Sequence, residues 1–310
     1  MSNNNTLVQN ITSTAKQQTL GLFLAFITVL IWSSYTLSLR VGALTPLTLV
    51  ELTFFRYAIP GLILLPVFLK SMKNYAKVPP LYLLGIIIGS GLPFFLMSGY
   101  AMQLTQVAYG STLIPGTTPL FVTIIAVMIF KQKLPLFRTI GLSIIFSGIV
   151  FMLVDAGSSL DETLLLGQGL FLFCALFWAI FTISIRVSGL SPLQVAALSA
   201  LPNGIFITLW IVITGPELGY SLMPLSELLA QILVQGIIVG IFSGLCFSAA
   251  ILRIGAEKAA AIGAATPVVA TSIAAFMLGE QISMSLLFGM LLVISGVLLA
   301  SGVLHGEKVS

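Results

Sequence analysis

The sequence predicts an all-α polytopic membrane protein of ten transmembrane helices, arranged as two inverted repeats of five helices. Three observations predict this fold. Of the 310 residues, 58% are hydrophobic and only 7% are charged, which is more apolar surface than a soluble fold can bury. Apolar runs of about 20 residues, long enough to cross ~30 Å of hydrocarbon as helices, recur along the whole chain. One stretch of the sequence also occurs twice.

The repeated stretch relates the two halves of the chain. WSSYTLSLRVGALTP at residues 32–46 matches WAIFTISIRVSGLSP at residues 178–192 without a gap, and the two share Trp, Thr, Ser, Arg, Val, Leu and Pro. A Thr-Pro pair at 118–119 likewise matches one at 266–267. Because the chain is not of low complexity, these matches indicate an internal duplication.

The apolar runs, separated by short polar or charged breaks, give the elements in order. Five spans form a first repeat (20–154) and five form a second (164–303), joined by an external linker (155–163) and flanked by a polar, disordered tail (1–19) and a short tail (304–310). Since each repeat has an odd number of spans, the second enters the membrane from the opposite side. The predicted spans are 20–40, 47–69, 81–103, 107–130, 135–154, 164–186, 192–214, 229–252, 258–278 and 282–303.

Basic residues in the connections predict the orientation. Connections on one side of the membrane carry eleven of the 13 Lys and Arg residues, whereas the other side carries Arg40 alone. Because cytoplasmic loops hold the excess of Lys and Arg, we expect both termini in the cytoplasm. The basic side carries Lys16, Lys70, Lys73, Lys77, Lys131, Lys133, Arg138, Arg186, Arg253, Lys258 and Lys308.

The composition argues against several classes of function. The net charge of +4 is spread singly through loops, without the basic patch of a nucleic-acid-binding protein. Cys174 and Cys246 lie in apolar runs without metal-ligand partners, His305 is in the predicted tail, and the chain has no Gly-rich phosphate loop. We therefore expect no enzymatic activity, no cofactor, no metal and no nucleic acid. The expected partners are a small-molecule substrate and membrane lipid.

Two helix faces are candidates for binding a substrate, because aromatic rings can hold an apolar solute and hydroxyls can replace its water. The alternative is that the tryptophans pack between helices or anchor them at the interface. Each Trp lies about 12 Å inside the Arg end of its helix, at 1.5 Å per residue, which is deep for an interfacial anchor. The faces carry Trp32, Tyr35 and Thr36 in the first span and Trp178, Phe181 and Thr182 in the sixth.

A matched pair of prolines supplies a second group of candidates. Pro119 and Pro267 lie in the fourth and ninth spans, next to Thr118 and Thr266. A proline inside a helix frees a carbonyl, which is tolerated in a membrane where hydroxyls, water or neighbouring helices satisfy it. We expect kinked helices that line the substrate path; a structural bend with locally bonded threonines is the alternative. Tyr100 of the third span is a further candidate, with core packing as its alternative.

Glu51 and Arg56 are the ionisable residues well inside a span. A charge at the centre of a membrane helix costs about 2.5 to 3.5 kcal/mol, so such residues are functional candidates. Arg56 is expected either to contact a solute carboxylate or to bond to carbonyls as a structural anchor. Glu51 is a candidate site for proton or cation coupling, and an ion pair near the outer end of its helix, with Arg40 as a partner, is the alternative.

The order of these motifs resembles the EamA-type branch of the drug/metabolite transporter superfamily over residues 20–303. The shared features are an early Trp in the first and sixth spans, FFRYA in the second, a Pro in the fourth and ninth, and GEQIS before a Gly-rich last span. The resemblance implies a carrier of small solutes, in bacteria typically an exporter of amino acids or other metabolites in the inner membrane. It also implies a central cavity bounded by spans 1, 3, 4, 6, 8 and 9.

We therefore expect a secondary active transporter that exports small metabolites across the bacterial inner membrane by alternating access. A flippase for lipid-linked or other amphipathic solutes, within the same superfamily, is the alternative, and a basic cavity would favour it. A membrane-embedded transferase is a remote alternative, since the loops lack paired acidic or histidine residues.

Overall fold

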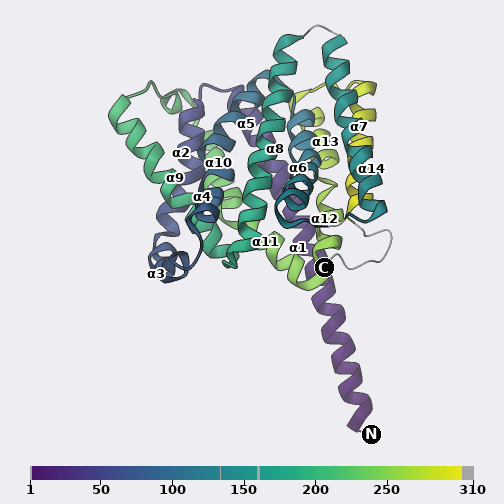
Figure 1. Ribbon diagram of the computed structural model, residues 1–310. Helices are drawn as coiled ribbons and strands as arrows, with labels where there is room; N and C mark the ends of the chain where they lie inside the picture. Colours follow the sequence, from purple (N-terminus) through teal and green to yellow (C-terminus); the bar gives the residue numbers. More distant parts are fainter. Residues whose placement is uncertain (1, 133, 159–160, 302–310) are drawn as a thin grey trace.

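The computed structural model describes residues 2–132, 134–158 and 161–301, without the side chains of residues 2–15, 155–158 and 256–257. Over these residues the chain forms helices and no strand. Lys133, part of the predicted linker (159–160) and the predicted C-terminal tail with His305 and Lys308 lie outside the described residues. The helices pack side by side into one bundle (Figure 1).

The helices follow the predicted spans, with additional breaks. The first half contains α1 (Ser2–Ala43), α2 (Leu49–Ile63), α3 (Leu65–Tyr75), α4 (Pro80–Gly89), α5 (Leu92–Leu104), α6 (Val107–Phe130) and α7 (Leu136–Ser158). The second half contains α8 (Glu162–Ser188), α9 (Pro192–Thr214), the 3₁₀ turn η1 (Tyr220–Leu222), α10 (Leu225–Gln231), the π-helix η2 (Ile232–Phe242), α11 (Ser243–Ile254), α12 (Ala256–Gly263), α13 (Thr266–Leu278) and α14 (Met284–Ala300). Because α1 begins at Ser2, the N-terminal stretch predicted to be disordered is helical instead.

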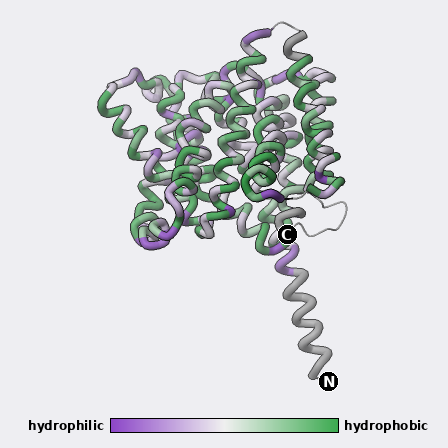
Figure 2. Tube along the Cα trace, viewed as in Figure 1, coloured by the Kyte–Doolittle hydropathy of each residue, from purple (hydrophilic) through white to green (hydrophobic). Residues whose placement is uncertain are grey.

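Eight helical segments of the described residues are long and apolar enough to cross a membrane. The predicted second span corresponds to α2 and α3, which form a pair bent by 76°. Pro60 near the end of α2 and Pro66 in the first turn of α3 explain this break. The predicted tenth span corresponds to α14, which is apolar but only 17 residues long. Figure 2 shows hydrophilic residues gathered towards the two ends of the bundle. Ten crossings therefore stay a prediction.

The helices pair in a pattern that repeats when the two halves are exchanged. α1 packs against η2 and α11, and its counterpart α8 packs against α4 and α5. Three further contacts join an element of one half to its own counterpart: α2 with α9, α6 with α13, and α7 with α14. The main buried apolar cluster contains residues of both halves, such as Phe95 and Phe171. The core thus lies between the two repeats.

Glycines let α7 and α14 approach closely. A Cβ at Gly296 would lie 2.7 Å from the carbonyl oxygen of Gly141, closer than real Cβ contacts, and small residues are the usual means of close packing in membranes. We expect Gly296→Ala to lower the free energy of unfolding by about 1 to 3 kcal/mol, measured by thermal unfolding in detergent. Gly169→Ala is the control, because its Cβ would meet no heavy atom within 4 Å. Equal stability of the two variants would contradict the packing.

Candidate functional site

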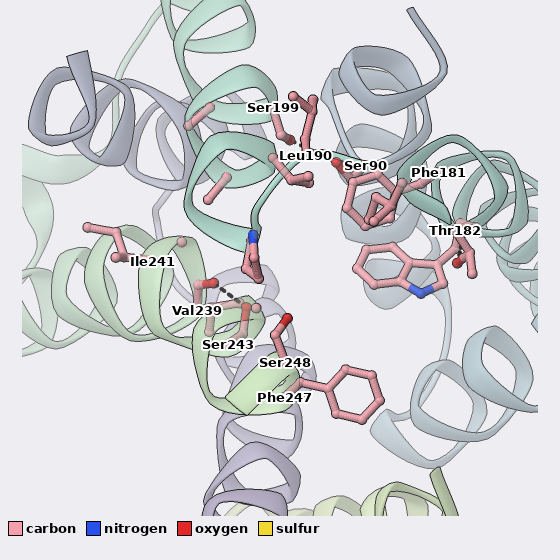
Figure 3. A pocket seen from close by; sticks show the side chains of 18 of the residues that line it. Ser90, Phe181, Thr182, Leu190, Ser199, Val239, Ile241, Ser243, Phe247 and Ser248 are labelled. Carbon is pink, nitrogen blue, oxygen red and sulfur yellow. Dashed lines mark hydrogen bonds between the residues drawn. The ribbon is translucent and has the colours of Figure 1, made fainter. Parts of the chain in front are cut away.

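A cavity of about 370 Å³ lies between the two halves. Its lining comes from α1, α2, the junction of α4 and α5, α8, α9, η2 and α11. Figure 3 shows Ser248 of α11 and Phe181 of α8 facing the same space from different sides. The lining extends to Arg186, Leu190 and Pro192, where α8 ends and α9 begins. The cavity therefore reaches the end of the bundle at which α8 finishes.

The structure brings five of the predicted binding residues together in this lining. The five residues are Trp32, Arg56, Trp178, Phe181 and Thr182. They come from the first, second and sixth predicted spans, so the repeated stretch contributes to the cavity from both halves.

Two predicted residues of α1 lie behind the lining. The Tyr35 hydroxyl is 2.9 Å from the Ser98 hydroxyl, and Thr36 is buried and donates to the Ser33 carbonyl at 3.1 Å. Their counterparts in α8, Phe181 and Thr182, reach the cavity. The same helix face therefore reaches the cavity at these positions in α8 but not in α1.

The proline pair and Tyr100 do not contribute to the lining of this cavity. Thr118 donates to the Ile114 carbonyl within α6, and Thr266 at the start of α13 donates to the Gly263 carbonyl at the end of α12, both at 2.7 Å. Both threonines therefore bond to nearby backbone. Pro119 and Pro267 belong to α6 and α13, which pack against each other. Tyr100 is 46% exposed. The cavity is thus bounded by spans 1, 2, 3, 6, 7 and 8 instead of the expected set, and ligand roles for these residues stay predictions.

Arg56 places a positive charge at the cavity between two aromatic rings. Its guanidinium carbon lies 5.9 Å from the ring centre of Tyr35 and 5.7 Å from that of Tyr57. Within the described part of the chain it forms no ion pair with an acidic side chain, and its buried Nε has no hydrogen-bond partner. The alternative of an anchor bonded to carbonyls therefore finds no support here, since cation–π contacts hold the side chain.

Matched aromatic pairs flank the cavity. Trp32 contacts Phe247 with ring centres 4.9 Å apart, and Trp178 contacts Phe94 at 5.2 Å. Both phenylalanines end a short repeated motif, SGLPF at 90–94 and SGLCF at 243–247. The two copies of this motif are separated by a different number of residues than the copies of the other repeated stretches. The motif was missed for this reason, although both strings can be read in the sequence.

Both copies of that motif lie where the helical structure changes. The break between α4 and α5 is held by Asn203, which accepts from the Leu92 N–H at 3.0 Å and donates to the Ile87 carbonyl at 2.9 Å. In the second half the π-helix η2 gives way to α11 at Ser243. Ser90 and Ser243 both line the cavity. Broken helices and π-helical segments are frequent at binding sites in membrane transporters and other proteins.

Residues of α9, η2 and α11 complete the lining and were not among the predicted binding residues. They include Ser199, whose hydroxyl lies 2.8 Å from that of Ser90, and Gly244 and Ser248 of α11. A Cβ at Gly244 would meet no heavy atom within 4 Å. This glycine therefore borders open space, although its GxxxG spacing with Gly240 is one that often marks close helix packing in membranes.

The opposite end of the bundle is closed by an ion pair. Arg40 Nε donates to Glu280 at 2.9 Å and its Nη1 donates to the Met102 carbonyl at 3.0 Å. Glu280 also accepts from the Val107 N–H at 3.0 Å. These bonds join the end of α1 to the α5–α6 and α13–α14 connections. The alternative in which Arg40 is the partner of Glu51 is wrong, because Arg40 pairs with Glu280.

Beneath this ion pair a buried amide network also joins α1 to the second half. Ser38 donates to Gln231, whose amide donates to the Ser38 carbonyl at 3.1 Å. Gln235 of η2 donates to the Ser38 hydroxyl at 3.1 Å. Polar bonds therefore close the Arg40 end of the bundle, while the cavity reaches the Arg186 end.

Glu51 caps α2 and fixes a connection of the second half. Its carboxylate accepts from the backbone N–H and the hydroxyl of Thr48, and from the N–H groups of Gly219 at 3.0 Å and Tyr220 at 2.7 Å. Four donors therefore surround a carboxylate that is not part of the cavity lining. A coupling role for Glu51 stays a prediction.

We expect Glu51→Gln to destabilise the protein. Glutamine places an N–H₂ group opposite backbone N–H donors, and hydrogen bonds to a charged acceptor contribute about 1.5 to 3 kcal/mol. Thermal unfolding in detergent should show a lower midpoint, while the pH dependence of transport should keep its shape. A changed pH dependence with unchanged stability would instead support coupling at Glu51.

No group of three or more His, Cys, Asp or Glu side chains able to hold a metal ion occurs within the described ranges. The polar groups of the cavity are thus two arginines, hydroxyls and backbone at the helix breaks, with aromatic rings around them. This arrangement can bind a solute through one charged contact and several apolar ones.

Comparisons with known proteins agree with this architecture. The model of the EamA-like transporter family matches twice, at residues 19–154 and 165–302. The chain is similar to the uncharacterized transporter YoaV of Bacillus subtilis (strain 168), at 23% identity over 90% of this chain and 96% of that protein. It is also similar to the uncharacterized transporter YyaM of the same organism, at 26% identity over 76% of each.

A crystal structure of another protein shares the fold. It superposes with a TM-score of 0.60 at 18% sequence identity, covering 93% of this chain and 99% of the other. The similarity therefore extends over nearly the full length of both chains.

Proposed function

Because the chain belongs to the EamA-like transporter family, with each half matching the family once, we propose that it is a secondary active transporter that exports small amphipathic metabolites, such as amino acids, across the bacterial inner membrane. The cavity between the halves is the proposed substrate site. Both termini are proposed to be cytoplasmic, so the cavity opens to the cytoplasm and Arg40 lies outside.

The observation that carries this proposal is Arg56 in the cavity lining. It is an arginine within a membrane-spanning helix that has no acidic partner among the described residues. A charge in that position is costly unless it faces water or a ligand. Its presence in the same lining as Trp32 and Trp178 supports a site where a polar group of the solute meets Arg56 and the apolar part of the solute meets the rings.

The proposed mechanism is alternating access between two inverted repeats. The cavity reaches the Arg186 end, while Arg40 and Glu280 close the other end. Arg40 and Arg186 are equivalent positions of the repeat. Exchange of the conformations of the two halves would open the Arg40 end and close the Arg186 end, as in other transporters built from inverted repeats.

Counterflow in proteoliposomes tests this function. Liposomes that contain the purified full chain are loaded with an unlabelled amino acid or organic acid and diluted into a trace of the labelled compound. The proposal expects faster accumulation of label than in protein-free liposomes, for at least one member of a metabolite panel. Accumulation equal to that of protein-free liposomes for every compound would contradict it.

A flippase for lipid-linked anions is the second candidate, because Arg56 and Arg186 both line the cavity. The two functions differ in the molecule that is transported. A small-solute exporter moves small amphipathic acids across the membrane, whereas a flippase moves a fluorescent lipid anion from one leaflet to the other. Lipid movement without solute counterflow would favour the flippase.

A further inference from the structure

The cavity carries positive charge without a negative counterpart. Arg56 of α2 and Arg186 of α8 line it, and no Asp or Glu occurs among the described residues of the lining. Arg138 of α7 lies within electrostatic reach of Arg186, and the two charges repel. A potential of one sign in a cleft with apolar walls attracts solutes of the opposite charge.

The guanidinium of Arg56 is suited to receive an anion. Tyr35 and Tyr57 flank it at 5.9 and 5.7 Å, and its Nε has no partner although it is buried. Arginine presents N–H groups in a planar fork that matches both oxygens of a carboxylate. An unpaired charge in low dielectric is unfavourable, so a bound anion would complete the site.

Aromatic rings supply the complementary apolar surface. Trp32 and Phe247 form one pair, and Trp178 and Phe181 form another, each with ring centres 4.9 Å apart. All four residues line the cavity. Its volume of about 370 Å³ lies at the lower end of the range for small-molecule sites. The Arg56 guanidinium and this much ring surface fit a carboxylate with an aromatic or branched apolar body.

We infer that the solute is recognised as an organic anion, through a carboxylate bound by Arg56, and that an ammonium group is not required. This inference rests on the proposed use of the cavity as the transport site. An amino acid would then bind through its carboxylate, with its ammonium near hydroxyls and ring faces. An amine that lacks a carboxylate would meet two arginines and no acid.

Three compounds that share one carbon skeleton test this inference. They are 3-phenylpropanoate, phenylalanine and phenethylamine, titrated onto the full chain in nanodiscs by calorimetry. We expect 3-phenylpropanoate to bind at least as tightly as phenylalanine, and phenethylamine to bind at least about tenfold more weakly, because it loses a charge-assisted bond. Tighter binding of phenethylamine than of 3-phenylpropanoate, or no binding of any of the three, would overturn the inference.

Variants of Arg56 and of a control arginine test whether Arg56 causes the preference for carboxylates. Arg56→Gln should weaken both carboxylates at least about tenfold and should not weaken phenethylamine, because the variant removes a charge that repels the ammonium group. Arg56→Lys should give an intermediate loss for the carboxylates. Arg253→Gln is the matched control, since Arg253 bonds to the Ala249 carbonyl and does not line the cavity. Equal weakening of all three compounds in Arg56→Gln would overturn the inference.

Failure of the substrate class and failure of the transport function give different results. If the solute is not an organic anion, the affinities of the three compounds do not follow the predicted order. The cavity still opens to each side of the membrane in turn, as measured by sided labelling of Thr36→Cys and Thr182→Cys. If the protein is not a transporter, that change of side is absent whatever the compounds do.

Discussion

Replacement of Gly244 by leucine is expected to block transport while leaving the fold intact. Gly244 lines the cavity, and a Cβ there would meet no heavy atom within 4 Å, so the new side chain enters open space instead of the packed core. Leucine also has a higher helix propensity than glycine, by about 1 kcal/mol. We expect the rate of counterflow to fall at least about tenfold, equivalent to about 1.4 kcal/mol.

Gly169→Leu is the matched control for this experiment. Gly169 of α8 also has no heavy atom within 4 Å of a built Cβ, but it does not line the cavity. Both variants should unfold at temperatures close to that of the wild type, and only Gly244→Leu should lose counterflow. Full transport by Gly244→Leu, or an equal loss in both variants, would place the substrate path elsewhere.

Arg40→Gln and Glu280→Gln are each expected to open the Arg40 end of the bundle. Removal of one partner from a buried ion pair costs about 3 to 5 kcal/mol. Arg40 is 19% and Glu280 8% exposed, so we reduce this to about 1 to 2 kcal/mol for solvent screening. In the proposed alternating-access mechanism the pair forms only in the state with this end closed, so its loss should shift the population towards the opposite state about five- to thirtyfold.

Thr36→Cys reports this shift, in a chain whose own cysteines, Cys174 and Cys246, are replaced by alanine. Thr36 is buried, whereas its repeat counterpart Thr182 lines the cavity. Labelling of the new cysteine from the Arg40 side should accelerate in either single variant of the ion pair. Unchanged labelling in both variants would show that the ion pair does not control access.

The charge-exchanged double variant, Arg40→Glu with Glu280→Arg, separates the ion pair from its backbone contacts. Compared with the single variants, it should slow the labelling of Thr36→Cys only partly. The two charges attract each other again, but the bonds to the Met102 carbonyl and the Val107 N–H are lost. No slowing at all would assign the closure to those backbone bonds.

The two tryptophans of the repeated stretch and the arginine within a span were the predictable part of the site. Trp32 and Trp178 were expected to face a cavity because they occupy matched depths in the two halves, and both line it. Arg56 was predictable because the cost of a charge within a membrane helix leaves few structural uses for it. Duplication therefore identified the two tryptophans and charge identified Arg56, but duplication also marked the Thr-Pro pairs, which lie outside the lining.

Contacts between distant parts of the chain could not be predicted. Glu51 meets backbone N–H groups 168 and 169 residues later, and Arg40 meets Glu280 across 240 residues. Such partners depend on how connections fold over the bundle end. The sequence showed that these charges needed partners but did not identify them.

The set of helices around the cavity was predicted only in part, for two physical reasons. A proline in a membrane segment does not have to face a cavity: Pro119 lies within α6 and Pro267 in the first turn of α13, and the neighbouring threonines bond to nearby carbonyls. The change from η2 to α11 turns Gly244 towards open space, and the π-helical stretch does not follow the 3.6-residue period used to assign faces.

Sided labelling of Thr36→Cys and Thr182→Cys tests the central claim, that the two repeats exchange conformations around one cavity. Each variant is treated with a membrane-impermeant thiol reagent from one side of the membrane and then from the other. Alternating access predicts that Thr182→Cys reacts from the side at which α8 ends, and Thr36→Cys, more slowly, from the opposite side. Reaction of both from the same side, or of Thr36→Cys from neither, would contradict it.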